Sequence, residues 1–197
     1  MSTNNNKPTN DRTREQHADY EVYASMEDGN RYELVDGMLE LMSPGPNLLH
    51  QVISFQIQKR IADTCEQEYI ILDAPFDLIL SPTEVRQPDL AIIHRSRFHI
   101  LSKRGVEGPP DVVVEILSPS TLKRDKIHKS RTYAAFGIAE YWIVDPLSGS
   151  LEQYELKDGL YQLNNVFIGD EPVQSTSMPC LSFTMAAVMK YVEELPL

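Results

Sequence analysis

Residues 110–118 read PDVVVEILS, and this stretch places one acidic residue inside an otherwise apolar run. Ser118-Pro119-Ser120-Thr121 follows the run, whose length is typical of a buried strand rather than a helix. Successive side chains of a strand point to opposite faces, which puts Glu115 on one face with Val113 and Leu117. Burying an isolated carboxylate is costly. The sequence therefore predicts a central strand in which Glu115 meets an Arg or Lys, a metal ion, or several hydrogen-bond donors.

The overall composition is that of a soluble globular protein. The chain has 197 residues, suited to one domain, with 42% hydrophobic and 24% charged residues. Its 18 basic and 29 acidic side chains give a net charge of -11, which disfavours non-specific adherence to nucleic acid or anionic membranes. No apolar run approaches the ~20 residues that cross a bilayer, and a signal peptide is not recognisable. We therefore expect a cytoplasmic protein that does not enter a membrane.

The two cysteines, Cys65 and Cys180, lie far apart in the sequence. They form neither a metal-binding nor a redox spacing, and disulfides are rare in cytosolic proteins. We expect both to be reduced thiols.

The polar, Asn-rich residues 1–13 are predicted to be a disordered tail, and residues 14–197 to form one domain. In its first half, an Asp36-Gly37 pair between two strand-like runs is a strong hairpin signal. Apolar residues at helical spacing then predict a long helix, with His50 in its first turn. The predicted elements are a short helix over 20–26, a β-hairpin over 31–42, a helix over 47–67 and a strand over 69–80.

A second acidic residue repeats the pattern of the opening stretch. Residues 85–93, VRQPDLAII, are predicted to form a strand with Asp89 just inside it, preceded by a proline. Residues 94–109 are predicted to be a polar connection. A helix is predicted over 125–137, ending at a glycine, and it places Asp125, Lys129 and Tyr133 on one face close to the Glu115 strand.

The C-terminal part is predicted to be a β-meander closed by a helix. Turn residues separate its strand-like runs, and the last apolar residues have helical spacing. The predicted elements are strands over 141–146, 150–156 and 160–163 and a helix over 181–195.

Together these elements offer the carboxylates of Glu33, Asp89 and Glu115 with the ammonium of Lys129. His50 and Tyr133 are possible neighbours. Carboxylates that converge at one edge of a sheet suit Mg²⁺ or Mn²⁺. Such an ion stabilises an attacked phosphate and activates water, and a lysine can orient that water. The alternative is that each acid is an internal salt-bridge partner.

Several motifs, in order across about residues 20–190, carry a resemblance to a known family. They are YELVDG (32–37), His50, PD (88–89), PDVVVEILS (110–118), Asp125 with Lys129 and Tyr133, and GIAEYWIVDP (137–146). This set resembles the Uma2 family, also called DUF820, whose members are regarded as restriction endonucleases. The family is similar to the PD-(D/E)XK nucleases, and the resemblance implies an α/β fold around a mixed sheet and Mg²⁺-dependent phosphodiester hydrolysis.

The resemblance implies that Asp89 and Glu115 are the metal-binding acids and that Glu33 is an additional acid. One position departs from the nuclease pattern, because Leu117 stands where a lysine is expected two residues after Glu115. We expect Lys129 to supply that lysine from the neighbouring helix. Lys126 and Lys123 are less well placed alternatives.

The sequence therefore predicts a restriction-endonuclease-like α/β domain with a mixed sheet flanked by helices, an N-terminal β-hairpin and a C-terminal meander. It is interpreted as a Mg²⁺-dependent DNA endonuclease that acts as a homodimer. The dimer rests on the family resemblance and on the two sites that duplex cleavage needs. The alternative is a catalytically silent nucleic-acid-binding or regulatory module on the same fold, favoured by the acidic charge and by the lack of a DNA-reading motif.

Overall fold

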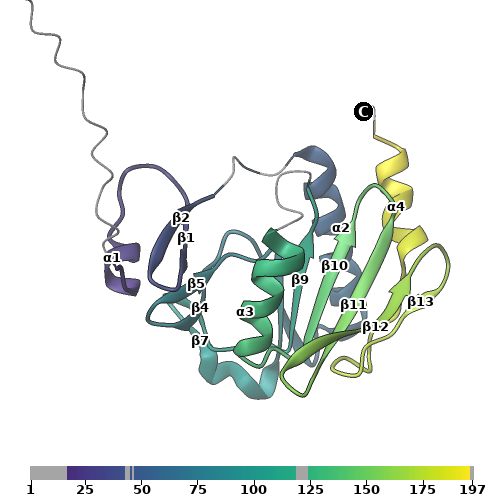
Figure 1. The fold of residues 1–197 in the computed structure, drawn as a ribbon. Coiled ribbons are helices and arrows are strands. Elements are labelled where there is room, and N and C mark those ends of the chain that lie inside the picture. The colour runs from purple at the N-terminus through teal and green to yellow at the C-terminus, as the bar shows by residue number, and fades with distance from the viewer. Residues whose placement is uncertain (1–16, 43–44, 46, 119–123, 196–197) are drawn as a thin grey trace, which may run out of the picture.

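The computed structural model describes residues 17–42, 45, 47–118 and 124–195, and its centre is a six-stranded mixed sheet (Figure 1). The expected tail over 1–13 lies outside these residues. The strand order is β12-β11-β10-β9-β6-β3, so the Glu115 strand is central, as predicted. The bounds are β3 (Tyr69–Asp73), β6 (Leu90–His94), β9 (Val112–Ile116), β10 (Glu140–Asp145), β11 (Ser150–Lys157) and β12 (Leu160–Phe167).

Strands β9 and β10 are the one parallel pair of this sheet among the described residues. The connection between them contains a π-helix (Arg124–Lys129) followed by α3 (Ser130–Ala135), in place of the single helix predicted over 125–137. Gly137, with φ +77°, follows the helix in the left-handed conformation that glycine allows. Strands β10, β11 and β12 form the predicted meander.

A second six-stranded sheet has the order β2-β1-β5-β4-β8-β7. Its first two strands are the predicted hairpin, with Val35 paired to Met38 across Asp36 and Gly37. Both turn residues have positive φ, as a two-residue hairpin turn requires. The bounds are β1 (Tyr32–Val35), β2 (Met38–Leu41), β4 (Leu78–Ser81), β5 (Glu84–Arg86), β7 (Leu101–Ser102) and β8 (Gly105–Glu107), with α1 (Tyr20–Ala24) before them.

The chain passes between the two sheets at places where the sequence predicted continuous strands. The strand predicted over 69–80 is β3 and β4, and the strand predicted over 85–93 is β5 and β6; in both cases the two strands belong to different sheets. Pro75 and Pro88 lie at these breaks, and proline offers no N–H to a sheet and restricts the residue before it. The predicted connection over 94–109 contains a 3₁₀-helix (Arg95–Ile100), β7 and β8.

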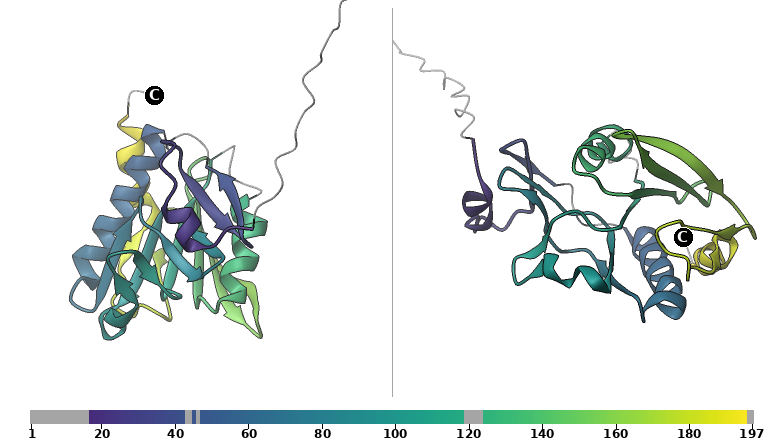
Figure 2. Two further views of the ribbon diagram at one scale, coloured as in Figure 1. Left: turned by 90° about the vertical axis from the view of Figure 1, so that its left-hand side faces the viewer. Right: turned by 90° about the horizontal axis from the view of Figure 1, so that it is seen from below.

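Helices α2 (Leu48–Cys65) and α4 (Met185–Glu193) cover one face of the central sheet, and α3 lies on the opposite side (Figures 1 and 2). Asn47 caps α2 through its side chain, which accepts from the N–H of His50. No helix in the described part of the chain is long and apolar enough to cross a membrane.

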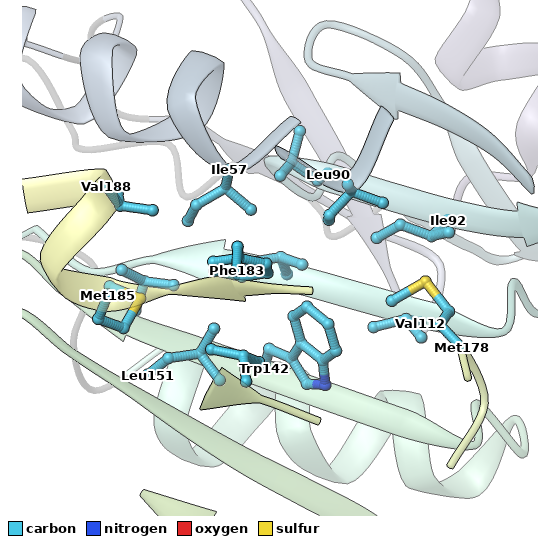
Figure 3. Packing of buried hydrophobic residues seen from close by; sticks show 14 of the residues in the cluster. Ile57, Leu90, Ile92, Val112, Trp142, Leu151, Met178, Phe183, Met185 and Val188 are labelled. Carbon is cyan, nitrogen blue, oxygen red and sulfur yellow. The ribbon is translucent and has the colours of Figure 1, made fainter. Parts of the chain in front are cut away.

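The main core lies between these two helices and the sheet (Figure 3). Val112, Val114 and Ile116 of β9 point into it, whereas Val113 and Leu117 belong to the core on the opposite face, as the predicted pleat requires. Burying each isoleucine or leucine of such a core stabilises the fold by about 1.5–3 kcal/mol. Its buried helical members are Ile53, Ile57, Ile61 and Cys65 of α2 and Met185 and Val188 of α4.

The expectation of two reduced cysteines is wrong, because Cys65 and Cys180 form a disulfide. Their Cα atoms are 5.4 Å apart although 115 residues separate them in the sequence. Cys65 ends α2, and Cys180 lies between the short paired strands β13 (Pro172–Val173) and β14 (Phe183–Thr184). The fold brings these segments together, which sequence spacing alone does not reveal.

We predict that reduction of this disulfide destabilises the protein. A cross-link that closes so long a loop restricts the unfolded chain, and such bonds typically contribute about 2–4 kcal/mol. Urea unfolding with and without a thiol reductant measures the difference, and Cys180→Ser should unfold at the same urea concentration under both conditions. Equal midpoints for the wild-type protein under the two conditions would contradict the prediction.

Candidate active site

The candidate site lies where the chain passes from the second sheet to the central sheet. Strand β5 ends at Arg86, and Asp89 comes directly before β6. The antiparallel register of β6 and β9 pairs Leu90 with Val114, which brings Asp89 to the end of β9. Asp89 Oδ2 accepts a hydrogen bond of 2.7 Å from the N–H of Ile116. The two acids expected to bind metal therefore come from neighbouring strands.

Glu115 is almost completely buried and is bound by two side chains of the neighbouring helical segment. Lys129 Nζ donates to Glu115 Oε1 at 2.7 Å, and Tyr133 Oη donates to the same oxygen at 2.8 Å. The lysine ends the π-helix, and the tyrosine lies one turn later in α3. A π-helix widens the turn locally and is frequent at functional sites. The predicted contact between this helix and the end of the strand is present.

Glu33 reaches the same lysine from the second sheet. It is fully buried, its Oε1 accepts from the N–H of Gln87 at 3.0 Å, and this oxygen lies 3.4 Å from Lys129 Nζ. Asp125 Oδ1 lies 3.7 Å from Nζ on another side. The ammonium of Lys129 thus lies among three carboxylates that come from β1, β9 and its own helical segment.

His50 is also part of the cluster. Its Nε2 lies 3.0 Å from Asp89 Oδ2, and both side chains are mostly buried. Because Asn47 caps α2 at the N–H of His50, the helix start and the imidazole are held together. Five of the seven residues proposed from the sequence are thus connected through the side chains of Lys129 and Glu115, and the His50–Asp89 pair meets them at the backbone of Ile116, the residue after Glu115.

The sequence prediction missed Arg86 and Glu84, which are nearly completely buried beside this cluster. Arg86 Nε donates to Glu84 Oε1 at 2.6 Å, and its Nη1 lies 3.5 Å from Glu33 Oε2. The available signal was the spacing of the two charges. Residues i and i+2 of a strand share one face, so an acid and an arginine flanking Val85 indicate a buried pair.

Burial and neighbouring charges shift the ionisation of the cluster. Desolvation raises the pKa of Glu115 well above its ordinary value, with a smaller opposing effect from Lys129 and further increases from Asp125 and Asp89. For Lys129, burial lowers the pKa, but the carboxylates of Glu115, Glu33 and Asp125 outweigh it and raise the pKa above its ordinary value. Burial also raises the pKa of Tyr133. The ammonium therefore stays charged, whereas Glu115 holds a proton more readily than an exposed glutamate.

The other candidate lysines do not join the cluster. Lys126 Nζ donates to both oxygens of Glu152 on β11, at 2.7 and 3.0 Å, and so points away from Glu115. Lys123 lies outside the described residues. Lys129 is the lysine that contacts the site in the part of the chain that the structure covers.

The two acids expected to bind metal each use one oxygen for their hydrogen bonds. Within residues 17–42, 45, 47–118 and 124–195, the donors to Asp89 meet Oδ2 and the donors to Glu115 meet Oε1. Asp89 Oδ1 and Glu115 Oε2 have no hydrogen-bond donor in this part of the chain. No three His, Cys, Asp or Glu side chains form a ready metal cluster among the described residues. Mg²⁺ is commonly held by only one or two carboxylates, with water or phosphate completing its shell, so this pair fits such an ion.

Comparisons with known proteins agree with this architecture. The Uma2 family model, described as "Putative restriction endonuclease", matches residues 15–186. A crystal structure of "a putative nuclease belonging to DUF820" from Anabaena variabilis superposes with a TM-score of 0.71 at 16% identity, covering 88% of this chain and 98% of its own. At that identity the likeness shows the fold alone. A search among curated proteins finds no match. Since the family model spans most of the chain, this protein belongs to the Uma2 family.

Proposed function

We propose that this protein is a metal-dependent endonuclease that hydrolyses DNA phosphodiester bonds. Asp89 and Glu115 would hold Mg²⁺ or Mn²⁺, Lys129 would act on the attacking water, and Glu33 would hold that lysine. Membership of the Uma2 family and the nuclease-like fold support the reaction class. The metal, the mechanism and a cytoplasmic location are part of the proposal.

One observation carries the metal assignment: Asp89 Oδ1 and Glu115 Oε2 lack hydrogen-bond donors in the described part of the chain, although their partner oxygens are bonded. Both oxygens therefore keep lone pairs that are available to a cation. Carboxylate oxygens are also the ligands that Mg²⁺ and Mn²⁺ prefer. A divalent ion bound there would neutralise charge on the attacked phosphate and lower the pKa of a coordinated water.

Among the residues that the structure describes, Lys129 is the one best placed to act on the reacting groups. Its Nζ contacts Glu115 Oε1 at 2.7 Å, so it lies beside the expected metal ligand. An ammonium has three protons to donate, and here the carboxylates of Glu115, Glu33 and Asp125 keep it charged. It can therefore orient a water molecule and offset negative charge that develops on the phosphate.

The second candidate is a nucleic-acid-binding or regulatory module that does not cut. The net charge of -11 favours its regulatory form, because phosphate backbones are usually bound by basic surfaces. The ion pairs of Lys129 favour a third possibility, in which the acids only stabilise the fold. Metal binding separates the third possibility from the other two, and cleavage separates the first from the second.

We predict that the wild-type protein binds Mn²⁺ and nicks supercoiled plasmid, and that Glu115→Gln does neither. The substitution keeps the shape of the side chain but removes the charge that attracts the ion. Lys129→Met should bind metal and cleave about 10²–10³-fold more slowly, the loss typical of removing one group that stabilises charge in the transition state. Calorimetric titration with Mn²⁺ and a time course of plasmid nicking measure the two properties.

Glu140→Gln is the matched control for Glu115→Gln. Glu140 is an equally buried acid on the neighbouring strand, but donors meet both of its oxygens, from Trp142, Gln153, Ser175, Thr176 and Ser177. Its substitution should lower stability and leave metal binding and nicking unchanged. Absence of metal binding by the wild-type protein would identify Glu115 as a structural acid.

We predict that metal affinity rises with pH through the raised pKa of Glu115. The ion binds the deprotonated carboxylate, so protons compete with it until the pH exceeds that pKa. Without metal, the free energy of unfolding changes with pH in the opposite direction. The stability that protonated Glu115 contributes is complete below the pKa of this residue in the unfolded chain, and it is lost as the pH rises through the higher pKa in the folded protein. Urea midpoints from about pH 4 to about pH 8 should show this loss in the wild-type protein and not in Glu115→Gln. Parallel curves would contradict the prediction.

The predicted homodimer is retained as a proposal, because cleavage of both strands of a duplex needs two sites. Analytical ultracentrifugation should give twice the chain mass of 22.4 kDa at micromolar concentration. A monomer would restrict the proposed activity to nicking or to single-stranded substrates.

A further inference from the structure

We propose that Arg86 is a positioning residue of this site, which fixes Glu33 and helix α3 so that Lys129 is held against Glu115. The inference rests on the proposed nuclease function for its kinetic consequence. Its geometric part, the placement of the Lys129 ammonium, can be tested without any activity.

Arg86 contacts three separate elements although its side chain is only 1% exposed. Its Nε donates to Glu84 Oε1 at 2.6 Å within β5. Its Nη1 lies 3.5 Å from Glu33 Oε2 on β1, and its Nη2 donates to Thr132 Oγ1 on α3 at 3.0 Å. The planar guanidinium carries donors in fixed directions and can bridge such partners together.

Two of the partners of Arg86, Thr132 and Glu33, connect it with the surroundings of Lys129. Thr132 precedes Tyr133, which donates to Glu115 Oε1, and the other oxygen of Glu33 lies 3.4 Å from Lys129 Nζ. Charges therefore alternate along one buried path, in the order Glu84, Arg86, Glu33, Lys129 and Glu115. Loss of the guanidinium would leave Glu33 without this cation and free α3 from the second sheet at Thr132.

The far end of this path is anchored in the N-terminal hairpin. Glu84 Oε2 accepts from the N–H of Asp36, a residue of the hairpin turn, at 2.9 Å. Arg86 is thus linked to the hairpin turn through Glu84, and its guanidinium contacts α3 directly at Thr132. Because a buried ion pair contributes little net stability compared with apolar packing, stability alone does not account for an arginine at this position.

The test uses Arg86→Met and Arg86→Lys. Methionine removes the cation. Lysine keeps the buried charge, and so favours a folded protein, but its single ammonium cannot bridge Glu84, Glu33 and Thr132. We expect both variants to cleave plasmid about 10–100-fold more slowly in kcat, because small misplacement of a reacting group has effects of this size. Mn²⁺ affinity and KM should change less than about twofold, since Asp89 and Glu115 are retained.

The second readout is the ¹H–¹⁵N resonance of the Lys129 ammonium, assigned by its loss in Lys129→Met. It should shift or broaden in both Arg86 variants. Arg97→Met is the control for loss of an arginine elsewhere along β9, because Arg97 forms a partly exposed ion pair of 2.9 Å with Asp111, which directly precedes the start of that strand. This control should change neither the resonance nor the rate.

An unchanged Lys129 resonance in a folded Arg86 variant overturns the proposal, and so does cleavage at the wild-type rate by Arg86→Lys. If the wild-type protein binds no metal and cuts no DNA, the proposed function fails, while the resonance still decides whether Arg86 positions Lys129. A shifted resonance in Arg97→Met would show a general structural effect and would also overturn the proposal.

Discussion

The packing of the two sheets against the helical connection depends on one buried ammonium, that of Lys129. Lys129 Nζ lies 2.7 Å from Glu115, 3.4 Å from Glu33 and 3.7 Å from Asp125, so it compensates acids from the central sheet, the second sheet and a helix at once. Buried charges are tolerated only when they are paired or hydrogen-bonded. The two sheets and the helical connection must therefore pack together for any of these acids to be accommodated, which makes the cluster a condition of the fold as well as its candidate site.

The positive charges of this cluster do not balance its negative charges. Two permanent cations, Arg86 and Lys129, are surrounded by five carboxyl groups, those of Glu33, Glu84, Asp89, Glu115 and Asp125. Excess negative charge in a low-dielectric region is relieved by a proton or by a bound cation. The raised pKa of Glu115 is the first form of relief. A divalent ion would be the second, and would turn a costly feature of the fold into a binding site.

The sequence indicated which residues of the candidate cluster meet better than it indicated where the strands begin and end. A single glutamate among valines pointed to β9, and the acidic and basic residues spaced four apart pointed to the helix that meets it. The breaks at Pro75 and Pro88 were missed because apolar residues continue on both sides of them, so the change of sheet leaves no mark in the hydrophobic pattern. The contact of Arg86 with Glu33 was missed because the two residues are distant in sequence, and the cysteine pair was missed for the same reason.

Leu117 occupies the position, two residues after Glu115, at which the sequence resemblance led us to expect a lysine, and its side chain is buried with Val113 in the core beside α3. Its N–H continues the pairing with β10 by donating to the carbonyl of Val144. The strand thus ends in ordinary packing, and the basic group comes from a different segment. In evolutionary terms the proposed role of Lys129 would separate two kinds of change: β9 could vary for packing after Glu115, whereas substitutions in the helical connection would alter the chemistry of the site.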